Sequence, residues 1–326
     1  MKPAILIARA IFPEVIERLS GYFDVESNQE DIIFTAPELL AKLKGKQGVL
    51  CTASARLNAE LLAQLPALKM VANMAVGYDN LDLPACTARG VMASNTPDVL
   101  NETTADFAWA LLMATARRVT ESEHWLRAGK WNKWSYDAFL GADIHGATLG
   151  IIGMGRIGQA VARRSMGFDM RVVYHNRSRL TDQQESYANN AVYVSKEELL
   201  KTADHVILVL PYSTETHHTI GAAELLMMKP SATLVNLARG GIVDDVALIA
   251  ALRQQKIAAA GLDVFENEPK FHPDFLTLKN VVLTPHIASA SEATRRAMAN
   301  CAADNLIAGL SHQRPPNLLN PAVFVN

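Results

Sequence analysis

The stretch Leu149-Gly150-Ile151-Ile152-Gly153-Met154-Gly155-Arg156-Ile157-Gly158 decides the fold that this sequence predicts. Its apolar run predicts a buried strand and the pattern after it predicts a helix, so a G-x-G-x-x-G motif lies in the turn between them. In that context Gly153 permits the tight turn, Gly155 lets the backbone approach a pyrophosphate, and Gly158 allows close packing of helix and strand. The stretch therefore indicates a dinucleotide-binding unit, with the helix N-terminus facing negative charge.

Apolar runs alternate with helical patterns on both sides of this stretch, which predicts parallel sheets with helices on both faces. The earlier strand-like runs are Ala4–Ala8, Gly48–Cys51 and Lys69–Asn73, with helical patterns at Ala36–Leu43 and Asn58–Leu65. The later runs are Thr148–Ile152, Arg171–Tyr174, His205–Leu210, Thr233–Leu237, Ala258–Leu262 and Val281–Leu283. Six such runs with a glycine turn after the first are typical of a doubly wound dinucleotide-binding domain.

The length of 326 residues favours two domains. Asn101 is a good N-cap for a long helical pattern over Glu102–Val119, which we expect to bridge the domains. The pattern over Ser291–Leu310 is helical again and is expected to cross back. We therefore predict an α/β protein with two Rossmann-like doubly wound domains. A cofactor domain over 101–290 is inserted in a discontinuous, flavodoxin-like domain made of 1–100 and of the crossing helix and tail at 291–326.

The composition is that of an ordinary globular protein, with 49% apolar and 20% charged residues. A formal net charge of -2 gives no sign of the basic face that nucleic-acid binding requires. Three cysteines in distant positions indicate neither a disulfide framework nor a zinc site. No apolar stretch is long enough for a signal peptide or a membrane span. We expect a soluble cytoplasmic protein without nucleic-acid or membrane partners.

The end of the second cofactor-domain strand predicts which dinucleotide is preferred. An NAD site has an Asp or Glu there to bind the ribose hydroxyls. This strand ends Tyr174-His175-Asn176-Arg177-Ser178-Arg179, with no carboxylate. Guanidinium and hydroxyl groups suit a 2′-phosphate, so the run favours NADPH, with NADH the weaker cofactor. Alternatively, both arginines belong to a solvated loop, since surface arginines are common.

Three polar clusters follow later strands of the same domain. They are Asn236-Leu237-Ala238-Arg239-Gly240-Gly241, the run from Gly261 to Pro269, and Thr284-Pro285-His286-Ile287-Ala288-Ser289. Ligands bind at the carboxyl ends of strands in open α/β sheets. An arginine, an acid and a histidine are therefore expected to converge on one crevice.

With these motifs in order, the chain resembles the D-isomer-specific 2-hydroxyacid dehydrogenase family over essentially its whole length. Within that family it is most similar to bacterial glyoxylate/hydroxypyruvate reductases of the 2-ketogluconate reductase type. The turn Ala75-Val76-Gly77-Tyr78-Asp79-Asn80, the run from Asp263 to Pro269 and the Asn-Arg-Ser at 176–178 carry this second resemblance. It implies reduction of glyoxylate, hydroxypyruvate or 2-keto-D-gluconate to the D-2-hydroxy acid with NADPH.

The resemblance also implies catalytic roles, which the chemistry of each group supports. Arg239 would hold the substrate carboxylate and polarise the keto group. His286 would donate a proton to the developing alkoxide, and Glu268 would keep that histidine protonated and oriented. Glu266 is a nearby competitor, but Glu268 directly precedes Pro269 as the motif requires. The backbone amides of Val76 and Gly77 would bind the substrate carboxylate, since glycine lets the backbone come close.

Further cofactor contacts are carried over from the family. Thr104 would lie by the nicotinamide, Leu210 and Pro211 would cover part of the ribose, and Asp263 would accept a hydrogen bond from the carboxamide. The full predicted cofactor set is Thr104, Gly153, Gly155, Arg156, Ile157, Gly158, Asn176, Arg177, Ser178, Leu210, Pro211, Ala238, Asp263 and His286. His217 and His218 would at most belong to a loop near the cofactor. No metal site is expected.

The resemblance further implies a homodimer, with an arm like Trp125–Asp143 reaching the partner. Two other enzymes stay open. A long phosphoglycerate dehydrogenase would carry a further regulatory domain, and a phosphite- or formate-oxidising relative would favour NAD. An NAD(P)-sensing binding protein of the co-repressor type is the alternative outside enzymes, and intact Arg239, Glu268 and His286 do not exclude it. Turnover of glyoxylate with NADPH would separate an enzyme from a sensor.

Overall fold

The computed structural model describes residues 2–324, which divide into two compact units. One unit comprises the described residues of Met1–Leu100 and Ser291–Asn326, and the other comprises Asn101–Ala290. Each has its own parallel sheet, so the predicted α/β fold with two doubly wound parts is confirmed. In the part of the chain that the structure describes, no helix has the length and apolar character needed to cross a membrane.

The first unit has a five-stranded parallel sheet of order β2-β1-β3-β4-β5, which is the flavodoxin-like order. Its strands are β1 (Ala4–Ile7), β2 (Asp24–Ser27), β3 (Gly48–Cys51), β4 (Met70–Asn73) and β5 (Met92–Ser94). Its helices are α1 (Pro13–Tyr22), α2 (Ala36–Leu43), α3 (Ala59–Ala63), α4 (Leu83–Ala88) and α12 (Glu292–Leu310), followed by a short 3-10 turn, Pro321–Val323.

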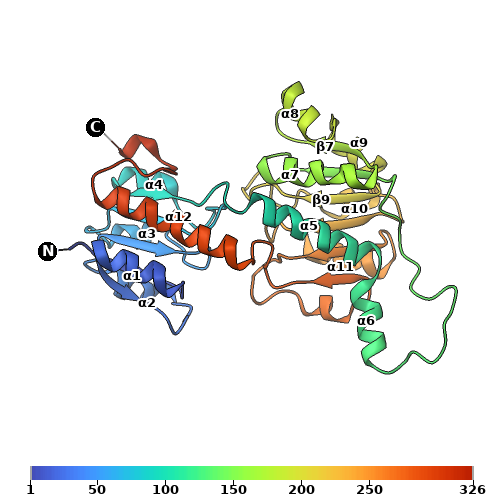
Figure 1. Cartoon of the computed structure of the whole chain (residues 1–326), viewed down its shortest axis with the longest axis horizontal. Coiled ribbons are helices and arrows are strands. Elements are labelled where there is room, and N and C mark those ends of the chain that lie inside the picture. The colour runs from blue at the N-terminus through green and yellow to red at the C-terminus, as the bar shows by residue number, and fades with distance from the viewer. Residues whose placement is uncertain (1, 325–326) are drawn as a thin grey trace. The chain divides into compact units, whose positions relative to one another are not determined.

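Successive side chains of each strand point to opposite faces of this sheet, and apolar side chains cover both faces. Leu6 of β1 contributes to the apolar cluster on one face, whereas Ile5 and Ile7 contribute to the cluster on the other. The helix α12 supplies the second cluster with Ala299 and Leu306, and it packs against α1 (Figure 1). The C-terminal helix thus completes the core of a sheet that the first 100 residues begin.

The second unit has a seven-stranded parallel sheet of order β12-β11-β10-β9-β6-β7-β8. Its strands are β6 (Thr148–Ile152), β7 (Arg171–His175), β8 (Val192–Tyr193), β9 (His205–Leu208), β10 (Thr233–Asn236), β11 (Ala259–Leu262) and β12 (Val281–Leu283). Its helices are α5 (Asn101–Ala116), α6 (Val119–Arg127), α7 (Arg156–Arg164), α8 (Asp182–Tyr187), α9 (Lys196–Thr202), α10 (Ala222–Met227) and α11 (Asp245–Arg253), with 3-10 turns at Ser165–Phe168 and Pro273–Thr277. In this order the direction of winding reverses between β6 and β9, which is where a doubly wound sheet binds its ligand.

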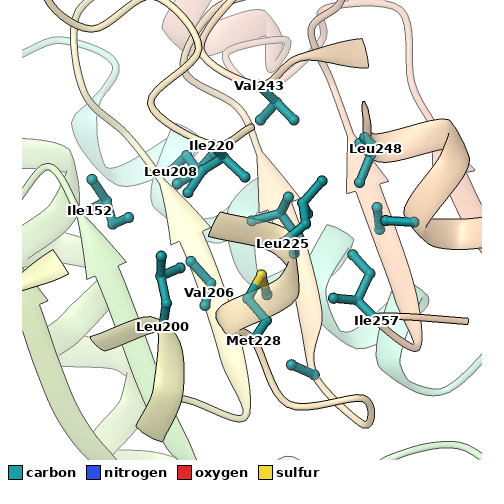
Figure 2. Packing of buried hydrophobic residues seen from close by; sticks show 14 of the residues in the cluster. Ile152, Leu200, Val206, Leu208, Ile220, Leu225, Met228, Val243, Leu248 and Ile257 are labelled. Carbon is teal, nitrogen blue, oxygen red and sulfur yellow. The ribbon is translucent and has the colours of Figure 1, made fainter. Parts of the chain in front are cut away.

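Both faces of the larger sheet are buried, which explains the continuous apolar runs of its strands. Val206 and Leu208 of β9 lie in the cluster on one face and Ile207 lies in the cluster on the other. Figure 2 shows the first of these clusters, where side chains of α9, α10 and α11 meet those of β6 and β9. The sheet that carries the glycine loop is therefore a rigid platform.

Helix α5 is fixed to α7, which starts at the glycine loop (Figure 1). The Trp109 Nε1–H donates to the carbonyl of Val161 at 3.0 Å. At the exposed side, Arg163 and Arg164 both pair with the carboxylate of Glu102 at 2.7 Å. These contacts hold the first turns of α5 against the last turns of α7.

Candidate active site

The glycine motif lies in the turn between β6 and α7, as the sequence predicts. The strand ends at Ile152, and the helix begins at Arg156 with Gly155 as its N-cap. Gly153 has a φ of +102°, a backbone conformation that residues other than glycine rarely adopt. The turn therefore brings the amide groups of the first helical turn to the carboxyl end of β6, where they can face an anion.

A side chain at each glycine of the motif would meet different surroundings. A Cβ on Gly158 would lie 2.3 Å from the Gly153 carbonyl oxygen, and one on Gly153 would lie 2.7 Å from the Leu210 amide nitrogen. A Cβ on Gly155 would meet no atom within 4 Å. Two of the glycines thus serve the packing of the chain, whereas the space beside Gly155 is open for a ligand. The space fits the pyrophosphate of a dinucleotide.

Asn176, at the end of β7, holds the glycine loop. Its Oδ1 accepts a hydrogen bond from the Met154 N–H at 2.7 Å, and its own carbonyl accepts one from the Tyr193 hydroxyl at 3.2 Å. The side-chain carbonyl of Asn176 is therefore occupied, which the sequence pattern does not reveal. Its position beside the loop agrees with a place next to the adenosine end of the cofactor.

Arg179, the second arginine of the run after β7, has a partner within the protein. Its guanidinium pairs through two nitrogens with the carboxylate of Glu185, at 2.9 and 2.7 Å. That pairing, helped by the hydroxyl of Tyr174, lowers the pKa of Glu185 to about 2. Arg179 therefore ties α8 to β7, since a buried carboxylate needs a partner. Arg177 and Ser178 are exposed and keep their predicted place at the strand end.

The remaining predicted cofactor positions vary in burial. Thr104 and Ala238 are buried, Ile157 and Leu210 are half-buried, and Arg156 and Pro211 are exposed. Leu210 lies next to the glycine loop, because its amide nitrogen is the atom that a Cβ on Gly153 would strike.

Asp263 is fully buried at the carboxyl end of β11. Its Oδ1 accepts hydrogen bonds from the Thr284 hydroxyl at 2.7 Å and the Ile287 N–H at 2.8 Å, and its Oδ2 accepts one from the Ala288 N–H at 2.9 Å. Burial raises the pKa of Asp263, and the hydrogen bonds oppose that rise. A carboxylate can accept about four hydrogen bonds, so one acceptor position remains on Oδ2. Asp263 therefore fixes the turn that contains His286, the predicted proton donor.

His286 and Glu268 are brought together. The His286 Nδ1 lies 2.8 Å from Oε2 of Glu268, and Oε1 of the same carboxylate accepts a hydrogen bond from the Phe265 N–H at 2.8 Å. His286 has a φ of +54°, and its own N–H donates to the Asp263 carbonyl at 2.9 Å. The carboxylate is thus held at both oxygens, and it fixes one ring nitrogen so that the other can serve a substrate.

Arg239 is half-buried after β10, in a loop that touches the Glu268 segment. Its Nη1 donates to the carbonyl of Ala238 at 2.9 Å, and its own carbonyl accepts a hydrogen bond from Asn236 Nδ2 at 3.1 Å. A Cβ on Gly240 would lie 1.7 Å from the Phe265 carbonyl oxygen. Only glycine allows this close approach, so Gly240 holds the arginine loop against the loop that carries Glu268, the predicted catalytic carboxylate.

The turn around Val76 and Gly77 belongs to the other unit, after β4. Asn95 Nδ2 donates to the Val76 carbonyl at 2.8 Å, and Asn73 Nδ2 donates to the Gly77 carbonyl at 2.9 Å. Within the described residues, no hydrogen bond uses the N–H of Val76 or Gly77. Two asparagines thus fix the carbonyl groups, and two amide donors remain for an anion.

The sequence interpretation missed three contributors to this site. Gly240, Thr284 and the Phe265 amide hold the chemical groups in place without being reactive themselves. The Gly240-Gly241 doublet after a strand was a usable signal, because paired glycines at a strand end indicate close backbone approach. Nothing in the sequence marks the Phe265 amide, whose role follows from the turn alone.

Comparison with known proteins agrees with this arrangement. Residues 109–288 match the model of the D-isomer specific 2-hydroxyacid dehydrogenase NAD binding domain. Over 99% of this chain, a glyoxylate reductase of Thermococcus gammatolerans is 47% identical, and the match covers 97% of that protein. A glyoxylate reductase of Pyrococcus furiosus is 46% identical, again over 99% of this chain and 97% of its own length.

A solved structure is similar over the entire chain. It is an NADPH-dependent glyoxylate/hydroxypyruvate reductase from Sinorhizobium meliloti in complex with NADP and malonate, with 35% identity and a TM-score of 0.89. The match covers 100% of this chain and 99% of that one. The glycine loop, the arginine loop and the histidine–carboxylate pair thus lie in a chain that has glyoxylate reductases among its full-length relatives. This chain belongs to the D-isomer specific 2-hydroxyacid dehydrogenase family.

Proposed function

We propose that this dehydrogenase reduces a small 2-keto acid, such as glyoxylate, hydroxypyruvate or 2-keto-D-gluconate, to the D-2-hydroxy acid with NADPH. The observation that carries the proposal is the 2.8 Å contact between His286 Nδ1 and Glu268 Oε2 in the unit that carries the glycine loop. Relatives named glyoxylate reductase support the substrate class. In this proposal 101–290 is the cofactor domain, and 1–100 with 291–326 is the substrate domain.

The proposed chemistry needs a proton at the keto oxygen. NADPH supplies a hydride to the carbonyl carbon when it is bound. His286 gives the proton to the oxygen that gains the negative charge, and Glu268 stabilises the imidazolium before that transfer. Because Glu268 is itself held by the Phe265 amide, the histidine needs no reorientation. In the reverse direction the same ring nitrogen accepts the proton of the hydroxy acid.

Two cationic or donor groups bind the substrate in this proposal. Arg239 has a planar guanidinium that can bind a carboxylate through two hydrogen bonds, and its loop is fixed by the close approach at Gly240. The amides of Val76 and Gly77 bind the carboxylate as well. Their carbonyl groups are held by asparagines, which supports a preformed pair of donors.

The cofactor is NADPH in preference to NADH. The end of β7 has no acidic side chain in Asn176-Arg177-Ser178, and an acid there would repel the 2′-phosphate. Arg177 is exposed, and no hydrogen bond or ion pair holds its side chain within the described residues. A charge-assisted hydrogen bond contributes about 1.5–3 kcal/mol. That corresponds to a preference of roughly tenfold to a hundredfold.

The enzyme acts as a homodimer in this proposal, through the segment that follows α6. Large side chains of this segment are exposed: Trp131 at 61%, Trp134 at 78% and Tyr136 at 81%. Aromatic side chains are enriched in subunit interfaces, which supports an interface at this segment. A measured molar mass of twice the chain in solution supports this part, and a monomer contradicts it.

A panel of 2-keto acids with NADPH and NADH tests the proposed function. Steady consumption of NADPH with glyoxylate or hydroxypyruvate is expected. Binding of NADPH without turnover of any member of the panel would instead identify a cofactor-sensing protein. Turnover of a different keto acid alone would correct the substrate and keep the mechanism.

A further inference from the structure

Two adjacent histidines and one glutamate form a cluster outside the predicted catalytic set. His217, His218 and Glu266 each offer one ligand atom, and these three atoms lie within 4.8 Å of one another. His218 Nε2 is 2.6 Å from Glu266 Oε1, and the two imidazole rings are stacked with centroids 3.8 Å apart. We propose that this cluster binds a first-row transition-metal dication of the Zn²⁺ class.

The backbone brings both rings to one side. Neighbouring residues of an extended chain point their side chains to opposite faces. His218 has a φ of +49°, in the left-handed region, and this turn places its ring on that of His217. A non-glycine residue in this region is uncommon and therefore needs an explanation from its surroundings. The shared carboxylate of Glu266 gives one.

The donor set suits zinc and its neighbours rather than hard cations. Two imidazole nitrogens and one carboxylate oxygen are a common protein ligand set for Zn²⁺, with a water in the fourth position. His217 is exposed, so water reaches the cluster. Mg²⁺ prefers oxygen ligands throughout and is not expected to bind.

Groups around the cluster can orient both rings. His218 Nδ1 lies 3.9 Å from Asp244 Oδ2, and His217 Nδ1 lies 3.2 Å from the Tyr212 hydroxyl. Such partners fix the tautomer and direction of metal-binding histidines. Ligand atoms about 2 Å from Zn²⁺ are about 3.3 Å apart in a tetrahedron. The 2.6 Å contact between His218 and Glu266 must therefore open by less than about 1 Å.

The cluster connects two loops next to the predicted catalytic groups. Residues 212–218 lie over Gly241, where an added Cβ would be 3.0 Å from the Tyr212 ring and 3.4 Å from His217 Nδ1. Gly241 follows Arg239 by two positions, and Glu266 precedes Glu268 by two. A metal bridging His217 and Glu266 restrains these loops, so we expect it to lower turnover.

Metal binding is tested directly on the full chain after chelator treatment. Competition with a chromophoric chelator is expected to show one Zn²⁺ bound per chain, and none when Mg²⁺ replaces it. His217→Gln should weaken Zn²⁺ binding by at least about tenfold, because a lost ligand should cost no less than a lost outer partner. Glu266→Gln should weaken it as well. The exposed His145 makes His145→Gln the matched control, which should bind like the natural protein.

Zn²⁺ binding can be measured without the reductase activity, so a failure of the metal site and a failure of the proposed function can be told apart. Equal Zn²⁺ affinity in the natural protein, His217→Gln and Glu266→Gln would overturn the site, provided thermal unfolding shows all three folded. Zn²⁺ should also slow the reaction of the natural protein but not that of His217→Gln. Equal inhibition of both would place the inhibitory metal elsewhere and overturn the link to turnover.

Discussion

His286 is the residue on which the proposed chemistry depends most. Replacing it with alanine removes the proton donor and leaves Glu268 without its 2.8 Å partner. We expect His286→Ala to lower the rate of keto-acid reduction by about two to four orders of magnitude, the usual contribution of a general acid. NADPH affinity, measured by fluorescence titration, should stay close to that of the natural protein. An unchanged rate of the chemical step would remove His286 from this role.

A substitution of Arg239 tests whether substrate binding needs the planar guanidinium or only a positive charge. Arg239→Lys keeps the positive charge but loses the planar pair of donors. We expect a loss of at least about tenfold in kcat/KM, since one tenfold step corresponds to about 1.4 kcal/mol. Steady-state kinetics with the best keto acid measures it. Near-normal kcat and KM in this variant would mean that Arg239 is structural.

Arg177 and Arg179 form a matched pair for cofactor preference. Arg177→Ala should cut the preference for NADPH over NADH by about tenfold, the effect of one charged hydrogen bond, and leave NADH almost unaffected. Arg179→Ala removes the partner of Glu185, so it should lower the melting temperature and leave the preference unchanged. Cofactor titrations and thermal unfolding separate the two. A changed preference in Arg179→Ala alone would reverse the assignment.

In the turn from β6 to α7, two glycines allow the stability of the fold and the binding of the cofactor to be tested separately. Gly158→Ala places a Cβ 2.3 Å from a backbone oxygen, so it should destabilise the fold by about 1–3 kcal/mol, the usual cost of overpacking. Gly155→Ala meets no atom of the protein. It should leave the melting temperature unchanged and weaken NADPH binding by about tenfold or more, because the methyl group occupies the space for the pyrophosphate. Normal cofactor affinity in folded Gly155→Ala would contradict the placement of the cofactor.

Some elements could be predicted closely and others could not. Runs that are largely apolar, such as Gly48–Cys51, Thr148–Ile152 and Val281–Leu283, are strands with those bounds. The edge strands β2, β5 and β8 were missed. Their sequences are Asp-Val-Glu-Ser, Met-Ala-Ser and Val-Tyr, so none has the long apolar run of a strand buried on both faces.

In the candidate site, too, some features could be predicted from the sequence and others could not. Arg239, Glu268 and His286 were predicted from motifs with a chemical reason for each residue, and the structure brings His286 and Glu268 together. The contacts that fix them depend on backbone atoms, such as the Phe265 amide on Glu268, and these have no signature. The sequence does not show that Arg179 has a partner, because Glu185 comes from the next helix and an arginine at a strand end looks the same with or without such a partner.

The whole molecule consists of two units, each with its own parallel sheet. The larger unit carries both the glycine loop and the pair formed by His286 and Glu268. The most direct measurement is kcat/KM for glyoxylate and hydroxypyruvate with saturating NADPH and then with saturating NADH. We expect turnover of at least one of these acids, with NADPH preferred by roughly tenfold to a hundredfold. If the folded protein binds NADPH and reduces neither these two acids nor 2-keto-D-gluconate with either cofactor, it is not the 2-keto acid reductase proposed.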